Sequence, residues 1–302
     1  MEDLGRLLVS PLSLSPSLPT DGYVAQLRRN CCYIVSAVIL KDNKVLMIQE
    51  AKLGCRGKWY LPAGRVDPGE TLTLAVQREV QEEAGFLFNP TRVVGIEGSS
   101  PGWMRFNFYG EISGGELKTH EDKESIQAKW FDLTEVLDRR IDLRAADIIP
   151  VIRNAVVQQE KLFVGTLPSA IERANYTVSL AIVFNDNSGS PISVVTDRSG
   201  GLPTMSIEKR DPKSHAKHIF DIFGIADKIC KEIVGVGSTS DLLFRGILTL
   251  AYDGRQGKDG IHFTLLYASS TQREISSDCS WQSSNSSDIR TLLSSDRIIP
   301  VK

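Results

Sequence analysis

A chain of 302 residues is too long for one small hydrophobic core and is long enough for two domains of ordinary size. Hydrophobic residues make up 41% and charged residues 24%, as in globular proteins, and the sequence contains no apolar run long enough to span a bilayer. The formal net charge of −2 argues against tight binding to long nucleic acid, because that affinity comes from basic residues that neutralise phosphates. We therefore expect two domains, no membrane or long nucleic-acid partner, and compatibility with a small anionic ligand.

The cysteine content and the N-terminal sequence indicate a reducing compartment. The five cysteines are odd in number, contain no repeated close pair of the zinc-binding type, and accompany no secretory signal. We therefore expect free thiols and a cytoplasmic location. Residues 1–29 include a Ser/Pro/Leu-rich stretch without long apolar periodicity, and we expect them to form a flexible N-terminal segment.

The first domain, expected over residues 30–159, begins with a β-hairpin. Two runs rich in apolar and β-branched residues, Tyr33–Leu40 and Val45–Ile48, flank the turn-forming residues 41–44. Later segments predict three strands and a closing helix, over residues 92–96, 104–112, 128–131 and 148–159.

Residues 174–302, which follow an expected linker at residues 160–173, repeat the order of the first domain. The matching segments, second domain against first, are Tyr176–Val183 against Tyr33–Leu40 and Gly201–Thr204 against Tyr60–Ala63. A helical stretch from His215 to Ile233 follows, and Gly235 comes after it. We interpret the repeat as a duplicated fold, with an unrelated α+β tail as the alternative.

One segment of the first domain combines a loop, an amphipathic helix and a cluster of carboxylates. It reads Gly64, five residues, Glu70, seven residues, Arg78-Glu79-Val80, one residue, Glu82-Glu83, one residue, and Gly85-Phe86. The carboxylates Glu79, Glu82 and Glu83 lie at positions i, i+3 and i+4, so a helix gathers them on one face. Such a cluster suits a hard divalent cation, Mg²⁺ or alternatively Mn²⁺, that also bridges a substrate phosphate. A solvated acidic face is the ordinary interpretation of a charge run, but it requires none of the fixed offsets.

Other residues of this segment have supporting roles. Arg78 lies four residues before Glu82 and can hold that carboxylate by a charge-assisted contact. Gly64 allows the loop to bend and to bring its backbone near the ion, and Gly85 is placed to end the helix in a left-handed conformation. Glu70 stands at the start of the helix, where a structural cap and direct metal ligation are both open.

The segment resembles the Nudix box of the Nudix hydrolase superfamily at every fixed position. The resemblance implies an α/β/α sandwich with a mixed sheet, followed here by a second, degenerate Nudix-like α/β domain, and it places a carbonyl metal ligand at Ala63. It also implies that a glutamate accepts the proton of a metal-bound water. The candidates are Glu79, Glu83 and Glu124, with Glu121 and Asp122 as alternatives to the last.

The second domain lacks this catalytic set. Aligning its helix with the first places residues 227–232 opposite residues 78–83 and leaves only Glu232 in common. Lysines replace two of the three carboxylates and would repel a cation. We therefore expect a non-catalytic domain that stabilises, regulates or completes the first.

Longer stretches resemble the animal two-domain enzymes that hydrolyse 8-oxo-guanine nucleoside diphosphates. These stretches are Asn30–Val35, Ile48–Lys52, Gly57–Arg65, Pro101–Phe106, Glu124–Trp130 and Leu143–Ile148. The resemblance implies conversion of 8-oxo-dGDP or 8-oxo-GDP to the monophosphate plus phosphate, and hence nucleotide-pool sanitation and DNA damage avoidance. A base site needs a stacking surface and polar groups at the ring edge. The candidates are Trp103, Phe106, Arg144 and Asp147.

Two other functions stay open. Pro101 lies at about the distance beyond the box where ADP-ribose pyrophosphatases often carry a proline, so an ADP-ribose or nucleotide-sugar pyrophosphatase is one alternative. A nucleotide-sensing or scaffold protein without turnover is the other, and the intact box argues against it. The expected partner is a small nucleotide, and the sequence specifies no oligomeric state.

Overall fold

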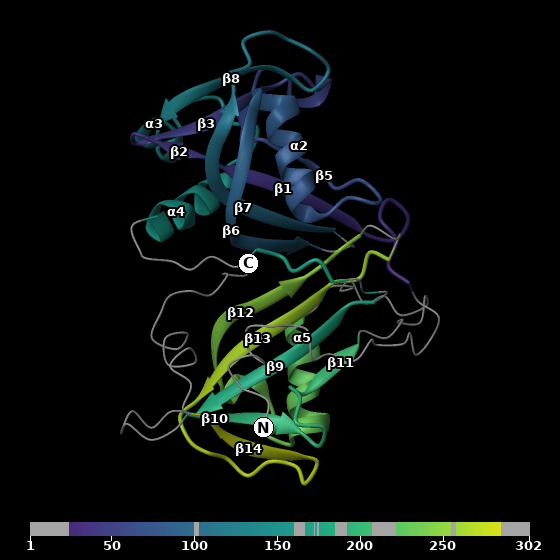
Figure 1. Ribbon diagram of the computed structural model, residues 1–302. Coiled ribbons are helices and arrows are strands. Elements are labelled where there is room, and N and C mark those ends of the chain that lie inside the picture. Colours follow the sequence, from purple (N-terminus) through teal and green to yellow (C-terminus); the bar gives the residue numbers. More distant parts are fainter. Residues whose placement is uncertain are drawn as a thin grey trace. The chain divides into compact units, whose positions relative to one another are not determined.

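The computed structural model places two compact units along the chain (Figure 1). It describes residues 24–99, 103–159, 167–171, 173, 175–184, 192–206, 222–254 and 258–284. The first unit consists of residues 32–98 and 103–167, and the second unit of residues 1–31, 99–102 and 168–301. Within the described residues, no helix is long and apolar enough to cross a membrane.

The described part of the expected N-terminal segment is bonded to the second unit. The backbone N–H of Leu27 donates to Oδ2 of Asp259 at 2.7 Å, and the N–H of Asp259 donates to the carbonyl of Ala25 at 3.0 Å. Buried backbone groups need such partners, so residues 25–27 pack as part of this unit. Residues 1–23 lie outside the described residues.

The first unit contains two sheets. One has the strand order β5-β1-β7-β6, and in the other β3 pairs with β2, β4 and β8. The strands are β1 Cys32–Val38, β2 Leu40–Lys41, β3 Lys44–Glu50, β4 Trp59–Tyr60, β5 Ala63–Arg65, β6 Phe86–Ser99, β7 Trp103–Gly115 and β8 Ser125–Asp132. The first sheet is mixed, because β1 runs parallel to β7 and antiparallel to β5. The predicted hairpin at residues 33–48 is confirmed by β1, β2 and β3.

Among the residues that the structure describes, three α-helices accompany these sheets: α2 Leu72–Ala84, α3 Leu133–Leu137 and α4 Ile148–Gln159. Helix α2 contacts β1 and β5 of one sheet and β3 and β8 of the other (Figure 1). Apolar side chains at helical spacing account for most of this packing, as the sequence predicted. The α/β class and the mixed sheet expected from the sequence are confirmed.

Helix α2 has well-defined ends. At its start, the side chain of Thr71 accepts a hydrogen bond from the N–H of Leu74 at 3.1 Å, which satisfies one of the free donors of the first turn. At its end, Gly85 has φ of 82° and its N–H donates to the carbonyl of Gln81. The predicted left-handed cap at Gly85 is confirmed, and it turns the chain directly into β6.

The second unit repeats most strand pairings of the first, but its described strands form one six-stranded sheet. Its strands are β9 Thr177–Phe184, β10 Ile192–Asp197, β11 Thr204–Ser206, β12 Leu243–Ala251, β13 His262–Ser269 and β14 Cys279–Ser284. They form one sheet because β10 pairs with both β9 and β14. Strands β11, β9 and β13 pair in the same order and directions as β5, β1 and β7 of the first unit. Next to β13 lies β12, at the position that β6 has next to β7. Likewise, β10 pairs antiparallel with β14 as β3 pairs with β8.

The repeat holds at the level of single residues. Ser36 pairs with Ala63 across β1 and β5, and Ser179 pairs with Thr204 across β9 and β11. In each unit the next N–H, from Ala37 or Leu180, donates to a proline carbonyl at 2.9 Å. These pairings agree with the predicted duplication, which stays a prediction.

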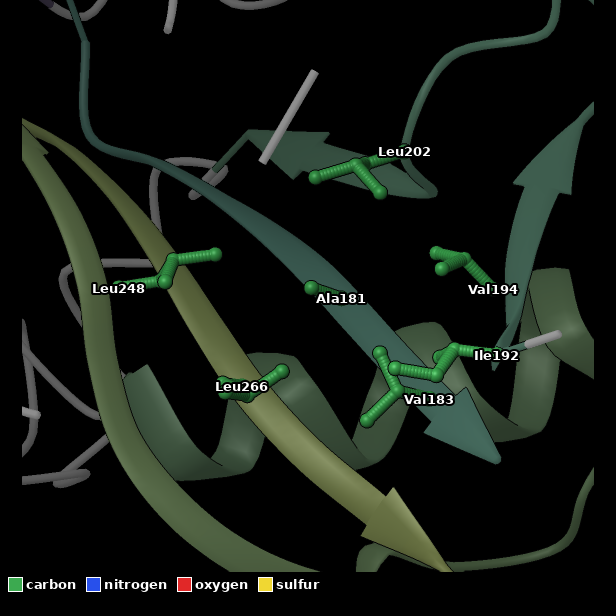
Figure 2. Close-up of a cluster of buried hydrophobic side chains, with 7 residues drawn as sticks. All are labelled: Ala181, Val183, Ile192, Val194, Leu202, Leu248 and Leu266. Atoms are coloured by element: carbon green, nitrogen blue, oxygen red, sulfur yellow. The ribbon is translucent and has the colours of Figure 1, made fainter. Parts of the chain in front are cut away.

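A cluster of buried apolar side chains covers one face of the second unit's sheet. Figure 2 shows its members turned toward one another from β9, β10, β12, β13 and the segment before β11. They are Ala181, Val183, Ile192, Val194, Leu202, Leu248 and Leu266. Helix α5, Ile222–Ile229, lies against β9 and continues into a π-helix at Cys230–Val234.

The burial pattern corrects the expected alignment of α2 with the helix of the second unit. Five of the seven buried residues of α2 have buried counterparts at a constant offset: Leu72, Val76, Glu79, Val80 and Ala84 match Ile222, Ala226, Ile229, Cys230 and Val234. Gly85 and Gly235 follow in the same left-handed conformation. The alignment of the two helices is thus shifted by one residue from the expected alignment. The buried positions define it better than the charged residues do. Ile229 and Ile233 occupy the positions of Glu79 and Glu83, and Glu232 occupies that of Glu82.

Replacing Gly85 with alanine should destabilise the first unit by more than about 1 kcal/mol, because a side chain in the left-handed region is strained. The added Cβ would also collide with the backbone carbonyl of Glu116. Thermal or urea unfolding measures the loss. Gly54→Ala is the matched control, since its Cβ would meet no atom within 4 Å. Equal stability of both variants would contradict this account of the cap.

Candidate active site

The acidic face of α2 lies against the loop that leads into and through β5. Glu83 is 1% exposed, and its Oε2 accepts a hydrogen bond from the N–H of Ala63 at 2.9 Å. Glu79 is 7% exposed, and its carboxylate lies where a side chain on Gly64 would have to be. Only glycine permits this approach, so the loop and two of the three predicted carboxylates come together.

Arg78 organises the other carboxylates of the segment. It forms a two-point contact with Glu70, from Nε at 2.9 Å and from Nη2 at 3.0 Å. Its Nη1 donates to Glu79 at 2.7 Å and to Glu82 at 3.1 Å. The predicted contact between Arg78 and Glu82 is present. Because a planar guanidinium can hold several carboxylates in fixed directions, Arg78 positions all three.

Glu70 is a partner of Arg78 and not the helix cap. Helix α2 begins at Leu72 with Thr71 as its N-cap, so Glu70 stands one position earlier. Its Oε2 also accepts a hydrogen bond from the N–H of Asp67 at 3.1 Å, which closes the turn before the helix. Glu70 thus connects the turn to Arg78.

Burial raises the pKa of both inward-facing glutamates. For Glu83 the pKa lies well above its usual range, first because of desolvation, with repulsion from Glu79 adding to it. For Glu79 desolvation also raises the pKa, and the contacts with Arg78 oppose the shift. Lys52 is the cation nearest to Glu83, with Nζ 3.9 Å from Oε1, but its side chain is half exposed. The two carboxylates therefore lack sufficient counter-charge.

The donor set fits a hard divalent cation. Five carboxylates, Glu50, Glu70, Glu79, Glu82 and Glu83, accompany three basic side chains, Lys52, Arg78 and Arg144, which leaves a formal charge of −2. Oxygen ligands of this kind are those that Mg²⁺ and Mn²⁺ prefer. Within the described residues no three acidic, histidine or cysteine side chains yet converge on one point. Arg78 and the N–H of Ala63 hold these oxygens instead, so a cation would compete with Arg78 for Glu79 and Glu82.

The segment before β8 lies at the C-terminal end of α2. Ser125 donates from Oγ to the carbonyl of Glu83 at 2.7 Å, and Lys118 donates from Nζ to the carbonyl of Glu82 at 2.8 Å. Glu124 pairs with its neighbour Lys123 at 3.2 Å. Its role as the base stays a prediction.

The two alternatives to Glu124 have other partners. Glu121 forms a two-point contact with Arg56, at 2.7 and 2.9 Å, on the exposed surface. Asp122 accepts hydrogen bonds from Lys118 and from the N–H groups of Glu124 and Ser125, and these contacts lower its pKa to about 2. Asp122 therefore shapes the turn before β8.

A second polar group adjoins the acidic helix, and the sequence did not reveal it. Glu50, the last residue of β3, is 2% exposed, and its Oε1 accepts a hydrogen bond from Nη1 of Arg144 at 2.6 Å. The guanidinium of Arg144 lies 4.8 Å from the ring centroid of Tyr60. Arg144, expected at the base site, therefore bridges Glu50 and Tyr60.

The network continues from Tyr60 through Asp147 to β7. The hydroxyl of Tyr60 donates to Oδ2 of Asp147 at 2.9 Å, and Nη1 of Arg105 donates to the same oxygen at 2.8 Å. Arg105 also donates from Nε to Glu97 at 2.7 Å, and Nδ2 of Asn107 donates to Glu97 at 2.9 Å. Burial and its acidic neighbour raise the pKa of Tyr60 far above its usual value, so its hydroxyl remains a donor.

The four residues predicted to bind the base divide into two groups. Asp147 and Arg144 flank Tyr60, and Trp103 is half-buried with the guanidinium of Arg105 5.9 Å from its ring centroid. Phe106 differs, because it is fully buried with its ring edge against Tyr33. Its expected stacking role is corrected: alternation along β7 turns Phe106 into the core and turns Arg105 and Asn107 to the other face.

Comparison with known proteins identifies the first unit. The family model described as the NUDIX domain matches residues 33–152. The Caenorhabditis elegans protein named putative nudix hydrolase 1 is 34% identical over 206 residues, 66% of this chain and 56% of that protein. The human protein named 8-oxo-dGDP phosphatase NUDT18 is 46% identical over 139 residues, 45% of this chain and 42% of that protein. The ADP-ribose pyrophosphatase of Methanocaldococcus jannaschii is 35% identical over 107 residues, 34% of this chain and 62% of that protein. The matches thus span about half the length of these relatives.

Glu83→Gln should raise the stability of the cation-free protein by on the order of 1 kcal/mol near neutral pH, a few degrees in melting temperature. The folded pKa of Glu83 is raised, so the wild type loses stability as the pH rises from the ordinary glutamate range through that pKa, whereas glutamine does not titrate. Melting curves in chelator from pH 4 upward measure the difference between the two proteins.

The exposed variant Glu111→Gln is the control and should follow the wild type at every pH. A constant difference between Glu83→Gln and wild type across this range would contradict the assigned cause of the pKa shift.

Proposed function

Because residues 33–152 are a Nudix domain, we propose that this chain hydrolyses a diphosphate bond in oxidised guanine nucleoside diphosphates, with a divalent cation. The products from 8-oxo-dGDP or 8-oxo-GDP are the monophosphate and phosphate. This activity would remove oxidised guanine from the nucleotide pool and so avoid DNA damage, and we propose a cytoplasmic location for it.

The observation that carries the proposal is the burial of Glu79 and Glu83 against the Ala63–Gly64 loop. Two carboxylates with raised pKa values, one of them pressed against a glycine, are costly for the fold. Perturbed acids of this kind cluster at functional sites. A solvated acidic helix face would have neither the burial nor the close loop.

Each residue of the box has a defined task in this proposal. Glu79, Glu82, Glu83 and the carbonyl of Ala63 would hold the cation, Mg²⁺ or Mn²⁺. The cation supplies screening of the phosphate oxygens and a water of lowered pKa. Arg78 holds Glu79 and Glu82 in place through the contacts described above.

A carboxylate must accept the proton of the attacking water. Glu79, Glu83 and Glu124 remain the candidates, and burial raises the pKa of the first two, which makes each a stronger base. Glu124 lies on the segment that Ser125 ties to the end of α2.

The polar network around Tyr60 supports an oxidised guanine as the base. Oxidation at C8 gives guanine a new carbonyl and an N–H at N7, so the altered edge has both an acceptor and a donor. Asp147 can accept from an N–H, and Arg105 or Arg144 can donate to a carbonyl. A site that is built for such groups discriminates strongly against a base that lacks them. The relative named 8-oxo-dGDP phosphatase supports the same substrate class.

We assign no catalytic role to the second unit. Ile229 and Ile233 stand at the positions of the two buried glutamates, so the helix cannot supply their oxygens. The polar residues Arg105 and Asn107 of β7 have the counterparts His262 and Thr264 on β13, by their equal pairing with β1 and β9. Burial and the nearby charge of Arg173 lower the pKa of His262 to about 3, so its ring is neutral, unlike the side chain of Arg105.

The ADP-ribose pyrophosphatase of Methanocaldococcus jannaschii favours a second candidate function, cleavage of ADP-ribose or a nucleotide sugar. Pro101, the residue that suggested it, lies outside the described residues. A sensing or scaffold role without turnover is the third.

Incubating the full chain and Mg²⁺ with 8-oxo-dGDP, 8-oxo-dGTP, dGDP and ADP-ribose separates these functions. We expect selective phosphate release from 8-oxo-dGDP, with kcat/KM at least about tenfold above that for dGDP, because unmatched polar groups penalise the normal base. Monophosphate plus ribose phosphate from ADP-ribose would favour the second function. Nucleotide binding without any product would favour the third.

Glu83→Gln should abolish the cation-dependent phosphate release, by about 10²-fold or more, because it removes both a ligand and a candidate base. The fold should stay intact, since the amide oxygen can still accept from Ala63. Steady-state phosphate release measures this, with Glu111→Gln as the exposed control. Activity of Glu83→Gln equal to that of wild type would refute the assignment.

A further inference from the structure

Glu50 is fixed in place by the backbone at the end of β3. Its N–H donates to the carbonyl of Lys58 at 2.9 Å, and its carbonyl accepts from the N–H of Gly57 at 2.8 Å. These contacts close the loop between β3 and β4 on itself. The carboxylate of Glu50 is therefore held at one position, 2% exposed, by a rigid strand end.

Only one oxygen of this carboxylate is satisfied. Oε1 accepts from Arg144 at 2.6 Å, whereas Oε2 has no hydrogen-bond partner among the described residues. Leaving a buried charged oxygen without a partner destabilises the fold, because that oxygen has lost its hydration and gained no hydrogen bond in exchange. The fold retains this cost although a neutral side chain would avoid it, which points to a ligand that supplies the missing partner.

Glu50 lies near the acidic face of α2 that carries Glu83. Helix α2 packs against β3, and the charge of Glu50 contributes to the raised pKa of Glu83. Lys52, two residues after Glu50, extends its ammonium group to 3.9 Å from Oε1 of Glu83. Desolvation, the charge of Glu50 and a hydrogen bond with Glu50 raise the pKa of the Cys55 thiol, whereas Arg144 and Lys52 lower it, so these side chains surround one small region. The thiol is a weak donor, and Oε2 of Glu50 still has no hydrogen-bond partner among the described residues.

We propose that Oε2 of Glu50 is a further ligand for a divalent cation, supplied by β3 in addition to the ligands of α2. The proposal deepens the proposed function and rests on it, because it adds a residue outside the box to the cation site. A metal cation suits this position better than a neutral hydrogen-bond donor does, because the surrounding groups carry a formal charge of −2. The ammonium group of Lys52, beside Glu83, is on a half-exposed, flexible side chain and can move away from the ion.

Titrating the full chain with Mn²⁺ in the absence of nucleotide, with free Mn²⁺ followed by electron paramagnetic resonance, tests the proposal. In Glu50→Gln the affinity for Mn²⁺ should fall at least about tenfold, because losing a ligand costs no less than losing a residue that orients one. Glu111→Gln, which removes an exposed charge on another strand, β7, should bind Mn²⁺ as the wild type does. Unchanged Mn²⁺ affinity in Glu50→Gln overturns the proposal and leaves Oε2 as an acceptor for a substrate group.

A charge-balanced variant separates ligation from a change in the electric field. Glu50→Gln combined with Arg144→Met has the net charge of the wild type, so a pure field effect would restore the affinity, whereas a lost ligand would not. Restored Mn²⁺ binding in the double variant overturns the proposal.

The charge-conserving variant Glu50→Asp covers the case in which Glu50→Gln fails to fold, as judged by thermal unfolding. Its side chain is shorter by one methylene, so Glu50→Asp should also bind Mn²⁺ weakly if the carboxylate oxygen must reach the ion, and wild-type affinity would overturn the proposal. Because no nucleotide is present, the result is independent of the substrate panel. Wild type that binds Mn²⁺ but leaves 8-oxo-dGDP intact would refute the proposed function alone.

Discussion

The burial of two like charges beneath one loop is the constraint on which the first unit depends. Glu79 and Glu83 face inward from α2, and the fold admits them because Gly64 leaves room for one carboxylate and the N–H of Ala63 donates to the other. Arg78 binds the carboxylates that remain partly exposed. Raised pKa values show that this compensation is incomplete. The buried carboxylates thus make an unfavourable electrostatic contribution to the stability of the fold, and a bound cation can reduce it.

Buried charged and polar side chains also lie on the strands near α2. Glu50, Arg144, Tyr60, Asp147, Arg105 and Glu97 form a chain of contacts from the acidic helix to the polar face of β7. Most of these groups are carried by strand ends and strand interiors, whose backbones are rigid. Apart from Oε2 of Glu50, the hydrogen bonds of this network hold its side chains in one arrangement. A base and a diphosphate bound along this chain would therefore be held at a fixed separation.

The sequence predicted the parts of the site that follow a local pattern. Helical spacing and the glycine at position 85 determined α2 and its end, and the box placed the loop beside the carboxylates. It could not predict Glu50 or Arg105, because β3 and β7 are buried on both faces and their polar residues look like interruptions of an apolar strand. A charged residue within such a strand is the signal that could have identified them. Phe106 was chosen for its aromatic ring, but the alternation of side chains along β7 turns that ring into the core.

The second unit shows what the fold becomes without that constraint. Its sheet keeps the pairing and register of the first, and its helix keeps the buried positions and the terminal glycine. Isoleucine stands at the two positions where the first unit buries glutamate, so the same surface contributes apolar packing instead of charge. Exchanging a buried carboxylate for a hydrocarbon of similar size removes desolvation cost and adds transfer free energy. These two positions of the helix therefore cannot favour both stability and cation binding. Glutamate there suits a cation at the expense of stability, as in the first unit, and isoleucine favours stability, as in the second.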